Sequence, residues 1–430
     1  MDRMTAKAGG RLVGEARAPS DKSMSHRALM LGAVAAGETR ITQLLEAGDV
    51  LSTAAALRAC GASVEREQGT WVVRHGAWSD PERALDLGNA GTGVRLLMGL
   101  LSGRGGYFSF VGDPSLMRRP MGRVLEPLRQ MGLSFDSNDG RLPVNISPSG
   151  LKGIRYELPM ASAQVKSAIL LAGMSAEGPT TVVEPVPTRD HTERMLNAFG
   201  AEVSTNGSEV TIQPGAELQS PGDLTIPSDP SSAAFPMVAA LIVPGSEVLL
   251  HEVMLNPRRA GLIGTLRKMG ARIEERDRRT LGGEEVADLA ISASALKAIR
   301  VPHDDVPDMI DEIPILAVAA ATAEGTMRIE GLEELKVKES DRLAATAGLL
   351  RAAGVTCRTG DDWLEIDGAP SVPGGGTVDT DHDHRIGMAT LVLGMVCDAP
   401  MSITGASAIA SSFPTFRTLM NDLGAEIAEA

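Results

Sequence analysis

The chain has 430 residues, which is long for one hydrophobic core and suits two domains of about 200 residues each. Hydrophobic residues make up 43% and charged residues 22%, a globular composition that excludes disordered and fibrous classes. The formal net charge of −14 argues against nonspecific binding to nucleic acid or to an anionic membrane. A site for an anionic ligand must therefore be locally basic.

The cysteines and apolar stretches limit the class of protein further. Cys60, Cys357 and Cys397 show no CxxC spacing, so neither a disulfide framework nor a zinc site is predicted. The chain opens without the pattern of a signal peptide, and the longest apolar stretches, near residues 233–243 and 313–321, are too short to span a membrane. We therefore expect a soluble, cytoplasmic protein.

A helix that ends in Gly recurs along the chain with a period of about 70 residues. Each copy reads as a last helical turn, a Gly at the C′ position where positive φ is needed, and then a strand. In chain order the segments are LRACGASV, LRQMGLSF, LNAFGAEV, LRKMGARI, LRAAGVTC and LMNDLGAEI, with Gly61, Gly132, Gly200, Gly270, Gly354 and Gly424.

A second pattern recurs between these segments: a polar helix opening, an Ala-, Leu- and Met-rich helix, a turn and an apolar strand. The openings are SDKSMSHR from Ser20, GNAGTGVR from Gly88, MASAQVKS from Met160, SDPSSAAF from Ser228, MIDEIPIL from Met309 and DHDHRIGM from Asp381. Ser, Asp and Asn are N-cap residues, and helices that are apolar on most faces must be buried. The sequence therefore predicts an α/β architecture with three units per domain.

A six-fold repeat is also compatible with a solenoid scaffold. The six polar openings differ from one another, however, and a simple array gives no reason for that variation. Helix N-termini bear partial positive charge and unsatisfied N–H groups, which bind anions. The different openings therefore favour divided roles around a shared anionic ligand.

In the first half, Lys22, Ser23 and Arg27 follow one helix opening, where an ammonium and a guanidinium suit phosphate and carboxylate groups. LGNAGTGVR is a Gly-rich turn that can bring backbone N–H groups to a phosphate, although it lacks the P-loop spacing and is equally compatible with a simple tight turn. Arg119 precedes Pro120, which predicts an extended loop before a helix.

In the second half, Asp311 and Glu312 begin an apolar helix, where a favourable acidic first turn is the simpler explanation. LKVKESDRL follows with five charges, either as a solvated loop or, beside Asp311, as acid–base groups and cations for an anionic substrate. His382 and His384 suggest a metal cluster, but no third ligand set is evident and Arg385 adjoins it, so no metal is predicted.

At these residues the chain resembles 5-enolpyruvylshikimate-3-phosphate (EPSP) synthases over nearly its whole length, in their bacterial class II branch. The resemblance rests on DKSMSHR, LGNAGT, RRPMGRVL, LPMASAQVKSA, TRDHTE, DPSSAAFP, MIDEIP, LKVKESDRL and DHRIGM, in this order. It implies a two-domain inside-out α/β barrel, with three βαβαββ repeats around buried parallel helices in each domain. One lobe would combine residues 1–19 with 241–430, the other would span 20–240, and the active site would lie in the cleft between them.

The resemblance also implies an activity: transfer of the enolpyruvyl group of phosphoenolpyruvate to the 5-hydroxyl of shikimate 3-phosphate, with release of phosphate through a tetrahedral intermediate. Such enzymes serve the shikimate pathway of aromatic amino-acid biosynthesis, need no metal or organic cofactor, and bind two small molecules; we expect a monomer. Shikimate 3-phosphate would contact Lys22, Ser23, Arg27, Ser162, Ala163, Gln164, Arg189, Asp311 and Lys338. Phosphoenolpyruvate would contact Lys22, Gly91, Arg119, Gln164, Arg342 and Arg385.

For catalysis we assign Asp311 as the base toward the hydroxyl and Glu339 as the proton donor to C3, with Lys22 and the arginines stabilising charge. An exchange of the two roles, or a share for Lys22, stays open. Ser411 departs from the family, since many members have Lys there, in contact with the phosphate of phosphoenolpyruvate. Insensitive class II members can have Ala at the position of Gly91, so we expect the inhibitor glyphosate to act more strongly on this chain than on a Gly91→Ala variant.

Two other functions stay open on the residues alone. The related transferase that acts on UDP-N-acetylglucosamine usually has a reactive Cys shortly before its loop Arg, whereas Ser115, Leu116 and Met117 stand in that region here. A non-catalytic phosphosugar-binding protein is the alternative from another class.

Overall fold

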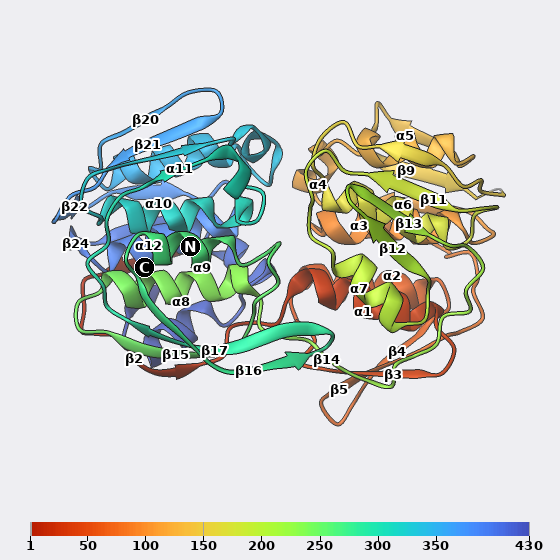
Figure 1. The fold of residues 1–430 in the computed structure, drawn as a ribbon, viewed down its shortest axis with the longest axis horizontal. Coiled ribbons are helices and arrows are strands. Elements are labelled where there is room, and N and C mark those ends of the chain that lie inside the picture. Colours follow the sequence, from red (N-terminus) through yellow and green to blue (C-terminus); the bar gives the residue numbers. More distant parts are fainter. Residues whose placement is uncertain (1, 149, 430) are drawn as a thin grey trace. The chain divides into compact units, whose positions relative to one another are not determined.

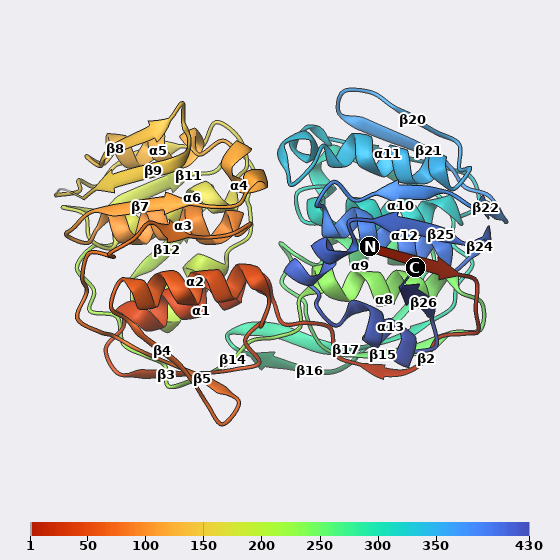
Figure 2. The same ribbon diagram turned by 180° about the vertical axis from the view of Figure 1, so that it is seen from behind.

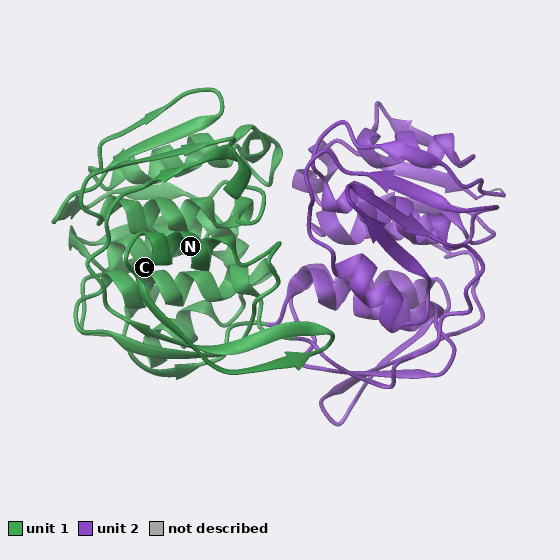
Figure 3. Cartoon of the chain, in the orientation of Figure 1, with its two compact units in different colours: residues 1–19, 227–430 green, residues 20–226 purple. Residues whose placement is uncertain are grey.

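The computed structural model describes residues 2–148 and 150–429, which form two compact units. Unit 1 combines Met1–Pro19 with Pro227–Ala430, and unit 2 is Ser20–Ile226 (Figure 3). The predicted division at residues 240 and 241 would cut helix α8 (Pro230–Ile242), whereas the chain divides just before that helix. The reason is that α8 packs against two helices of unit 1, α10 (Ile313–Ala321) and α12 (His384–Gly394). No helix of the described residues is long and apolar enough to cross a membrane.

Unit 2 contains three four-stranded sheets of one topology, each with a parallel edge strand beside an antiparallel hairpin (Figure 1). The first has the order β14 (Asp223–Thr225), β3 (Glu38–Thr42), β5 (Thr70–Arg74), β4 (Ser63–Glu67). The second is β6 (Leu85–Asp86), β7 (Phe108–Val111), β9 (Arg141–Ser147), β8 (Ser134–Asn138). The third is β10 (Arg155–Glu157), β11 (Thr180–Val183), β13 (Glu209–Ile212), β12 (Val203–Asn206).

Three apolar helices lie inside unit 2 and the amphipathic ones lie outside them. The buried helices are α1 (Lys22–Val34), α3 (Gly91–Ser102) and α6 (Ala163–Gly173), and α3 contacts both of the others. The others are α2 (Gly48–Ala59), α4 (Pro114–Arg118), α5 (Gly122–Gln130) and α7 (His191–Ala198). The buried helices present no polar face to water, so a surrounding sheet has to cover them.

Unit 1 repeats this plan with strands from both ends of the chain. Its sheets are β16-β17-β15-β2, β18-β19-β21-β20 and β23-β25-β1-β26, with β22 and β24 as an extra pair (Figure 2). The strands span β1 Arg3–Lys7, β2 Val13–Ala16, β15 Glu247–Met254, β16 Arg272–Leu281, β17 Glu284–Ser292, β18 Arg300–Val301, β19 Thr326–Glu330, β20 Cys357–Thr359, β21 Trp363–Asp367, β22 Val372–Gly374, β23 Thr377–Asp379, β24 Cys397–Ala399, β25 Met401–Thr404 and β26 Glu426–Glu429. The N-terminal strand β1 thus completes the last repeat, by pairing with β25 and β26.

The core of unit 1 is formed by α8, α10 and α12, which contact one another. Every residue of α10 and of α12 is buried. The outer helices are α9 (Gly261–Lys268), α11 (Arg342–Ala352) and α13 (Phe416–Asp422), and 3₁₀ turns span η1 His303–Asp305, η2 Ile310–Glu312, η3 Glu333–Val337 and η4 Ala406–Ser411. The six sheets around six buried helices confirm the predicted fold class.

The two recurring sequence patterns have direct structural causes. All six C′ glycines have positive φ, between 79° and 113°, directly after an outer helix and before a strand. A side chain with a Cβ adopts that conformation only with strain, which explains the repeated Gly. Four buried helices have the predicted side-chain N-cap, from Asp21, Ser162, Asp229 and Asp383.

Candidate functional site

The opening of α1 in unit 2 places the first group of predicted residues. Arg27 is buried and donates from Nε to Thr192 Oγ1 at 2.7 Å and from Nη2 to Ser167 Oγ at 2.7 Å. Its Nη1 also donates to the backbone oxygen of Ser23 at 3.0 Å, which confirms that these residues share a helix face. Lys22 is half-buried, and its Nζ lies 3.1 Å from an Asp49 carboxylate oxygen. Hydrogen bonds to three elements therefore fix Arg27, whereas Lys22 forms an ion pair with Asp49.

The opening of α3 brings three predicted residues, Gly91, Arg119 and Gln164, into one group. Arg119 ends α4 in extended backbone, as predicted, and its Nη2 donates to Asn89 Oδ1. A methyl group on Gly91 would lie 2.8 Å from Arg119 Nη1, so the guanidinium stands directly against this glycine. Gln164, from the first turn of α6, accepts a 2.7 Å hydrogen bond from Arg95 Nη1.

Sequence reasoning missed Arg95 and Thr92 in this group. Gln164 Nε2 donates to Thr92 Oγ1 at 3.0 Å, and Arg95 Nη2 donates to the backbone oxygen of Pro120 at 3.1 Å. Arg95 therefore links the openings of α3 and α6 to the loop that holds Arg119. The signal was present in LGNAGTGVR, since Arg95 is the one charged residue in an otherwise apolar helix, one turn after Gly91.

The opening of α6 holds the remaining predicted residues of unit 2. Ser162 caps the helix by accepting from the Val165 N–H at 3.4 Å, and Ala163 is its first residue. Arg189 is half-buried in the loop before α7. That loop is tied to α6 by Lys166, whose Nζ lies 2.9 Å from Glu184 and 2.6 Å from Glu193.

The Lys166 cluster was also missed, and it is almost fully buried. Lys166 is 1% exposed, and burial raises the pKa of the Glu193 carboxyl although Lys166 lowers it. Removing one partner from such a cluster leaves an uncompensated buried charge. Because Ser167 follows Lys166 and bonds Arg27, the cluster supports the site by fixing α6 to the loop before α7.

In unit 1 a cluster of opposite charges surrounds Arg342, the first residue of α11. Its Nη1 lies 2.9 Å from Asp311 Oδ1, its Nη2 2.5 Å from Glu339 Oε2 and its Nε 2.7 Å from Asp383 Oδ2. Arg342 is 1% exposed; burial opposes its charge, but the carboxylates of Asp383, Glu339 and Asp311 hold its pKa above the ordinary value. The two residues predicted to transfer protons thus share one guanidinium.

Lys338 and Arg385 complete this cluster. Lys338 Nζ lies 3.6 Å from Asp311 Oδ1 and 3.0 Å from Glu334 Oε1. Arg385, in the first turn of α12, donates from Nη1 to the backbone oxygen of Asp311 at 3.1 Å. The structure therefore gathers Asp311, Glu339, Lys338, Arg342 and Arg385, all five predicted residues of unit 1.

The sequence also indicated Ser411 and the two histidines as candidates. Ser411 lies in η4, where its Oγ donates to the backbone oxygen of Ala408 at 2.7 Å and lies 3.4 Å from His384 Nδ1. His384 is buried, His382 is exposed, and Asp383 between them is engaged by Arg342 and by the α12 N-cap. This segment thus contributes Arg385 and the Asp383 partner of Arg342 to the cluster.

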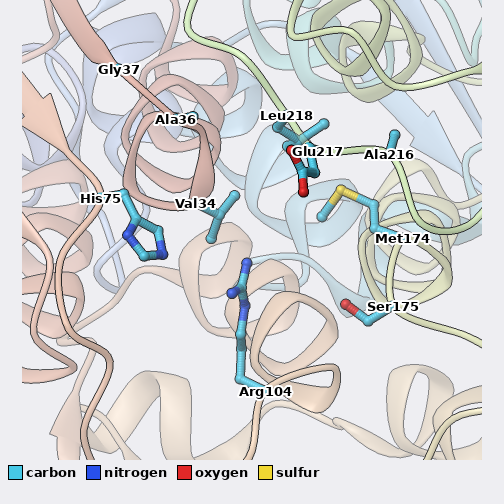
Figure 4. A pocket seen from close by; sticks show the side chains of 10 residues that line it. All are labelled: Val34, Ala36, Gly37, His75, Arg104, Met174, Ser175, Ala216, Glu217 and Leu218. Carbon is cyan, nitrogen blue, oxygen red and sulfur yellow. The ribbon is translucent and has the colours of Figure 1, made fainter.

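A separate cavity of about 590 Å³ lies in unit 2, at the carboxyl ends of α1, α3 and α6 (Figure 4). It is lined by Val34, Ala36, Gly37, His75, Arg104, Met174, Ser175, Ala216, Glu217 and Leu218. The predicted residues of unit 2 lie near the opposite ends of these helices, and the 12 residues of α3 span about 18 Å.

Arg104 extends into this cavity, and its guanidinium lies 5.2 Å from the Trp78 ring centre. Burial lowers the pKa of Arg104. Helix carboxyl ends bear partial negative charge, so a cation there stabilises the fold. None of the residues that line the cavity belongs to a predicted site.

Comparisons with known proteins support this fold. A structure of EPSP synthase from Acinetobacter baumannii superposes with a TM-score of 0.89 at 43% identity, covering 100% of both chains. The enolpyruvyl transferase NikO from Streptomyces tendae shares the fold alone, with a TM-score of 0.77 at 19% identity over 100% of this chain and 99% of its own. The fold is that of the enolpyruvyl transferases.

Sequence comparison narrows this class to one family. The family profile described as EPSP synthase (3-phosphoshikimate 1-carboxyvinyltransferase) matches residues 6–420. A 3-phosphoshikimate 1-carboxyvinyltransferase from Chelativorans sp. (strain BNC1) is 54% identical over 433 residues, 97% of this chain and 95% of its own. The chain belongs to the EPSP synthase family, and it transfers the enolpyruvyl group of phosphoenolpyruvate to shikimate 3-phosphate in the shikimate pathway of aromatic amino-acid biosynthesis. The predicted family, fold and enzyme class are confirmed.

Proposed function

We propose that the Arg342 cluster of unit 1 performs the proton transfers of this reaction, with Asp311 as base and Glu339 as acid. One observation supports the proposal most: both carboxylates contact the same buried guanidinium, at 2.9 and 2.5 Å. The contact of Arg342 Nε with Asp383 fixes the guanidinium, so Arg342 holds the two proton-transfer groups at a set separation. Such prior orientation lowers the entropy lost at the transition state.

The proposed reaction proceeds by addition and then elimination. Asp311 takes the proton of the 5-hydroxyl as its oxygen attacks C2 of phosphoenolpyruvate, while Glu339 delivers a proton to C3. In the second step Glu339 takes a proton back from C3, the C2–C3 double bond forms again, and the bond from C2 to the phosphate oxygen breaks, with Asp311 giving the hydroxyl proton to the departing phosphate. The products are the enolpyruvyl ether and inorganic phosphate. Exchange of the two roles, or a share for Lys22, stays open.

We assign the binding of shikimate 3-phosphate to residues of both units. In unit 2 these are Lys22, Ser23, Arg27, Ser162, Ala163, Gln164 and Arg189, and in unit 1 they are Asp311 and Lys338. The contacts of Arg27 with Thr192 and Ser167 support this assignment, because a rigidly held guanidinium binds phosphate with little loss of side-chain entropy. Lys22 adds a compact positive charge at the same helix opening.

Phosphoenolpyruvate, in the same proposal, binds Lys22, Gly91, Arg119 and Gln164 of unit 2 with Arg342 and Arg385 of unit 1. The contact group at the opening of α3 supports this, since Arg119 and the N–H groups of a helix start both suit an anion. Lys22 and the arginines would stabilise the phosphate and carboxylate charges as the adduct forms. The predicted monomeric state and cytoplasmic location stay predictions.

Release of phosphate distinguishes the proposed reaction from its alternatives. With phosphoenolpyruvate and shikimate 3-phosphate together, we expect steady release of inorganic phosphate, and none when either substrate is left out. Release only with UDP-N-acetylglucosamine as the acceptor would overturn the substrate assignment. Absence of release with both acceptors would favour a binding protein.

Gly91 should determine how strongly glyphosate, a mimic of phosphoenolpyruvate, inhibits the enzyme. In Gly91→Ala the new methyl group would lie 2.8 Å from Arg119 Nη1, so the guanidinium has to move within the proposed binding site. We expect the glyphosate inhibition constant to rise by about tenfold or more, with a smaller rise in the KM for phosphoenolpyruvate.

Gly48→Ala is the matched control for this substitution. Gly48 is also the first residue of a helix, and a Cβ there has no neighbour within 4 Å. Its inhibition constant should equal that of the parent enzyme. Equal constants for Gly91→Ala and the parent would contradict the prediction.

A further inference from the structure

Five buried side chains of unit 1 connect the openings of its three core helices. Arg259 Nη2 donates to Asp229 Oδ1 at 2.7 Å and to Ser231 Oγ at 2.9 Å, both in the opening of α8. Ser231 Oγ in turn donates to Glu312 Oε1, at the end of the η2 turn that begins α10. Glu312 Oε1 lies 3.7 Å from Arg385 Nη1, in the opening of α12. These side chains come from different sequence motifs, yet they form one continuous network of contacts.

The positive and negative charges of this five-residue network balance. Its members are two carboxylates, two guanidinium groups and one hydroxyl, and all five residues are buried. Burial raises the pKa of the Glu312 carboxyl, against the effect of Arg385 and Arg259. In a buried network each group depends on its neighbours, because an unpaired charge keeps its full desolvation penalty.

The η2 turn connects this network to the proton-transfer cluster. Its adjacent residues have different partners: the Asp311 carboxylate contacts Arg342 and Lys338, while the Glu312 carboxylate contacts Ser231 and Arg385. Arg385 also donates to the Asp311 backbone oxygen at 3.1 Å. The turn thus holds Arg385 at two points, one of which is the charged group of Glu312.

We propose that Glu312, supported by Arg259 through Ser231, is a positioning residue that holds the Arg385 guanidinium ready for phosphoenolpyruvate. This inference rests on the assignment of Arg385 to that substrate in the proposed function. Glu312 acts through Arg385 and takes no proton in the reaction. A long Arg side chain has many rotamers, and a partner that restricts them before binding improves affinity.

The test compares Glu312→Gln, Arg385→Gln and the double variant by steady-state kinetics with each substrate varied. Glu312→Gln keeps the shape of the side chain and removes its charge. We expect the KM for phosphoenolpyruvate to rise about tenfold in each single variant, and no further in the double variant. The KM for shikimate 3-phosphate should stay within about twofold, since only one substrate depends on Arg385.

Glu252→Gln is the matched control for a general loss of stability. Glu252 pairs with Arg17 at 2.7 Å in the same unit and has no proposed role in binding or catalysis. It should leave the KM for phosphoenolpyruvate unchanged even if the melting temperature falls. Ser231→Ala, a smaller change that breaks the link between Arg259 and Glu312, should raise the same KM by about threefold and serves if Glu312→Gln does not fold.

The outcomes separate this inference from the proposed function. A raised KM for phosphoenolpyruvate in Arg385→Gln, with an unchanged value in Glu312→Gln or Ser231→Ala, overturns the positioning role alone. Independent, multiplicative effects in the double variant also overturn it. An unchanged KM in Arg385→Gln overturns both the assignment of Arg385 and the inference that rests on it.

Discussion

Asp311→Asn and Glu339→Gln should each lower kcat by roughly a hundredfold or more. Both substitutions keep the size of the side chain and can still contact Arg342, but an amide exchanges no proton with a substrate at neutral pH. Because shikimate 3-phosphate is held mainly by groups of unit 2 in the proposed site, its dissociation constant should change little. Initial rates of phosphate release and calorimetric titration with shikimate 3-phosphate measure the two quantities.

Glu334→Gln is the control for these two variants. Glu334 pairs with Lys338 at 3.0 Å, beside the same cluster, and has no assigned role in proton transfer. Its kcat should stay within about threefold of the parent. Near-parent turnover in Asp311→Asn or in Glu339→Gln would remove that residue from its assigned role.

The fold was predictable because its signals are local. Each C′ Gly occupies a turn position that requires positive φ. Each Asp or Ser N-cap accepts a hydrogen bond from a backbone N–H two or three residues away. The Gly recurs in all six repeats and the side-chain N-cap in four, and both are visible without a structure. The order of strands within a sheet is not local, and no motif indicated that β14 pairs with β3 or that β1 completes the last sheet.

The domain division shows the same limit. Residues 227–240 belong by contacts to unit 1, because α8 packs against α10 and α12. After its first turn the sequence of α8 is apolar, so it does not indicate which helices pack against α8. The position of one crossing was therefore predicted 14 residues too late, although the repeat boundaries on both sides were clear.

The site was predictable where a motif places charged residues next to a helix opening. Lys338, Glu339 and Arg342 come from one segment. Lys338 and Arg342 contact Asp311, and Glu339 contacts Arg342. The supporting groups could not be found in this way. Lys166 pairs with residues 18 and 27 positions later, and Arg259 meets Asp229 and Glu312 only in the folded chain. Buried partners that lie far apart in the sequence can be identified only from a tertiary structure.

Replacing Arg342 should cause the largest loss of stability, because three carboxylates depend on it. In Arg342→Met the carboxylates of Asp311, Glu339 and Asp383 would face one another without their common cation, and Asp383 is completely buried. Removing one partner of a buried charge group typically costs about 3–5 kcal/mol of unfolding free energy. The midpoint of urea unfolding, followed by circular dichroism, should fall accordingly, and phosphate release should be lost as well.

Arg74→Met provides a control with the same number of partners at the surface. Arg74 lies within 4 Å of Glu38, Glu65 and Glu67, but 37% of its side chain is exposed, so water already screens those charges. Its unfolding midpoint should not change measurably. The unfolding midpoint of Arg342→Lys should lie between those of Arg342→Met and Arg74→Met. Lys keeps the positive charge, but its ammonium group cannot replace a planar guanidinium whose three nitrogens each contact a different carboxylate. If Arg342→Met unfolded at the parent midpoint, the carboxylates would have to be neutral or rearranged in the folded enzyme, and Arg342 could not be what holds Asp311 and Glu339 apart.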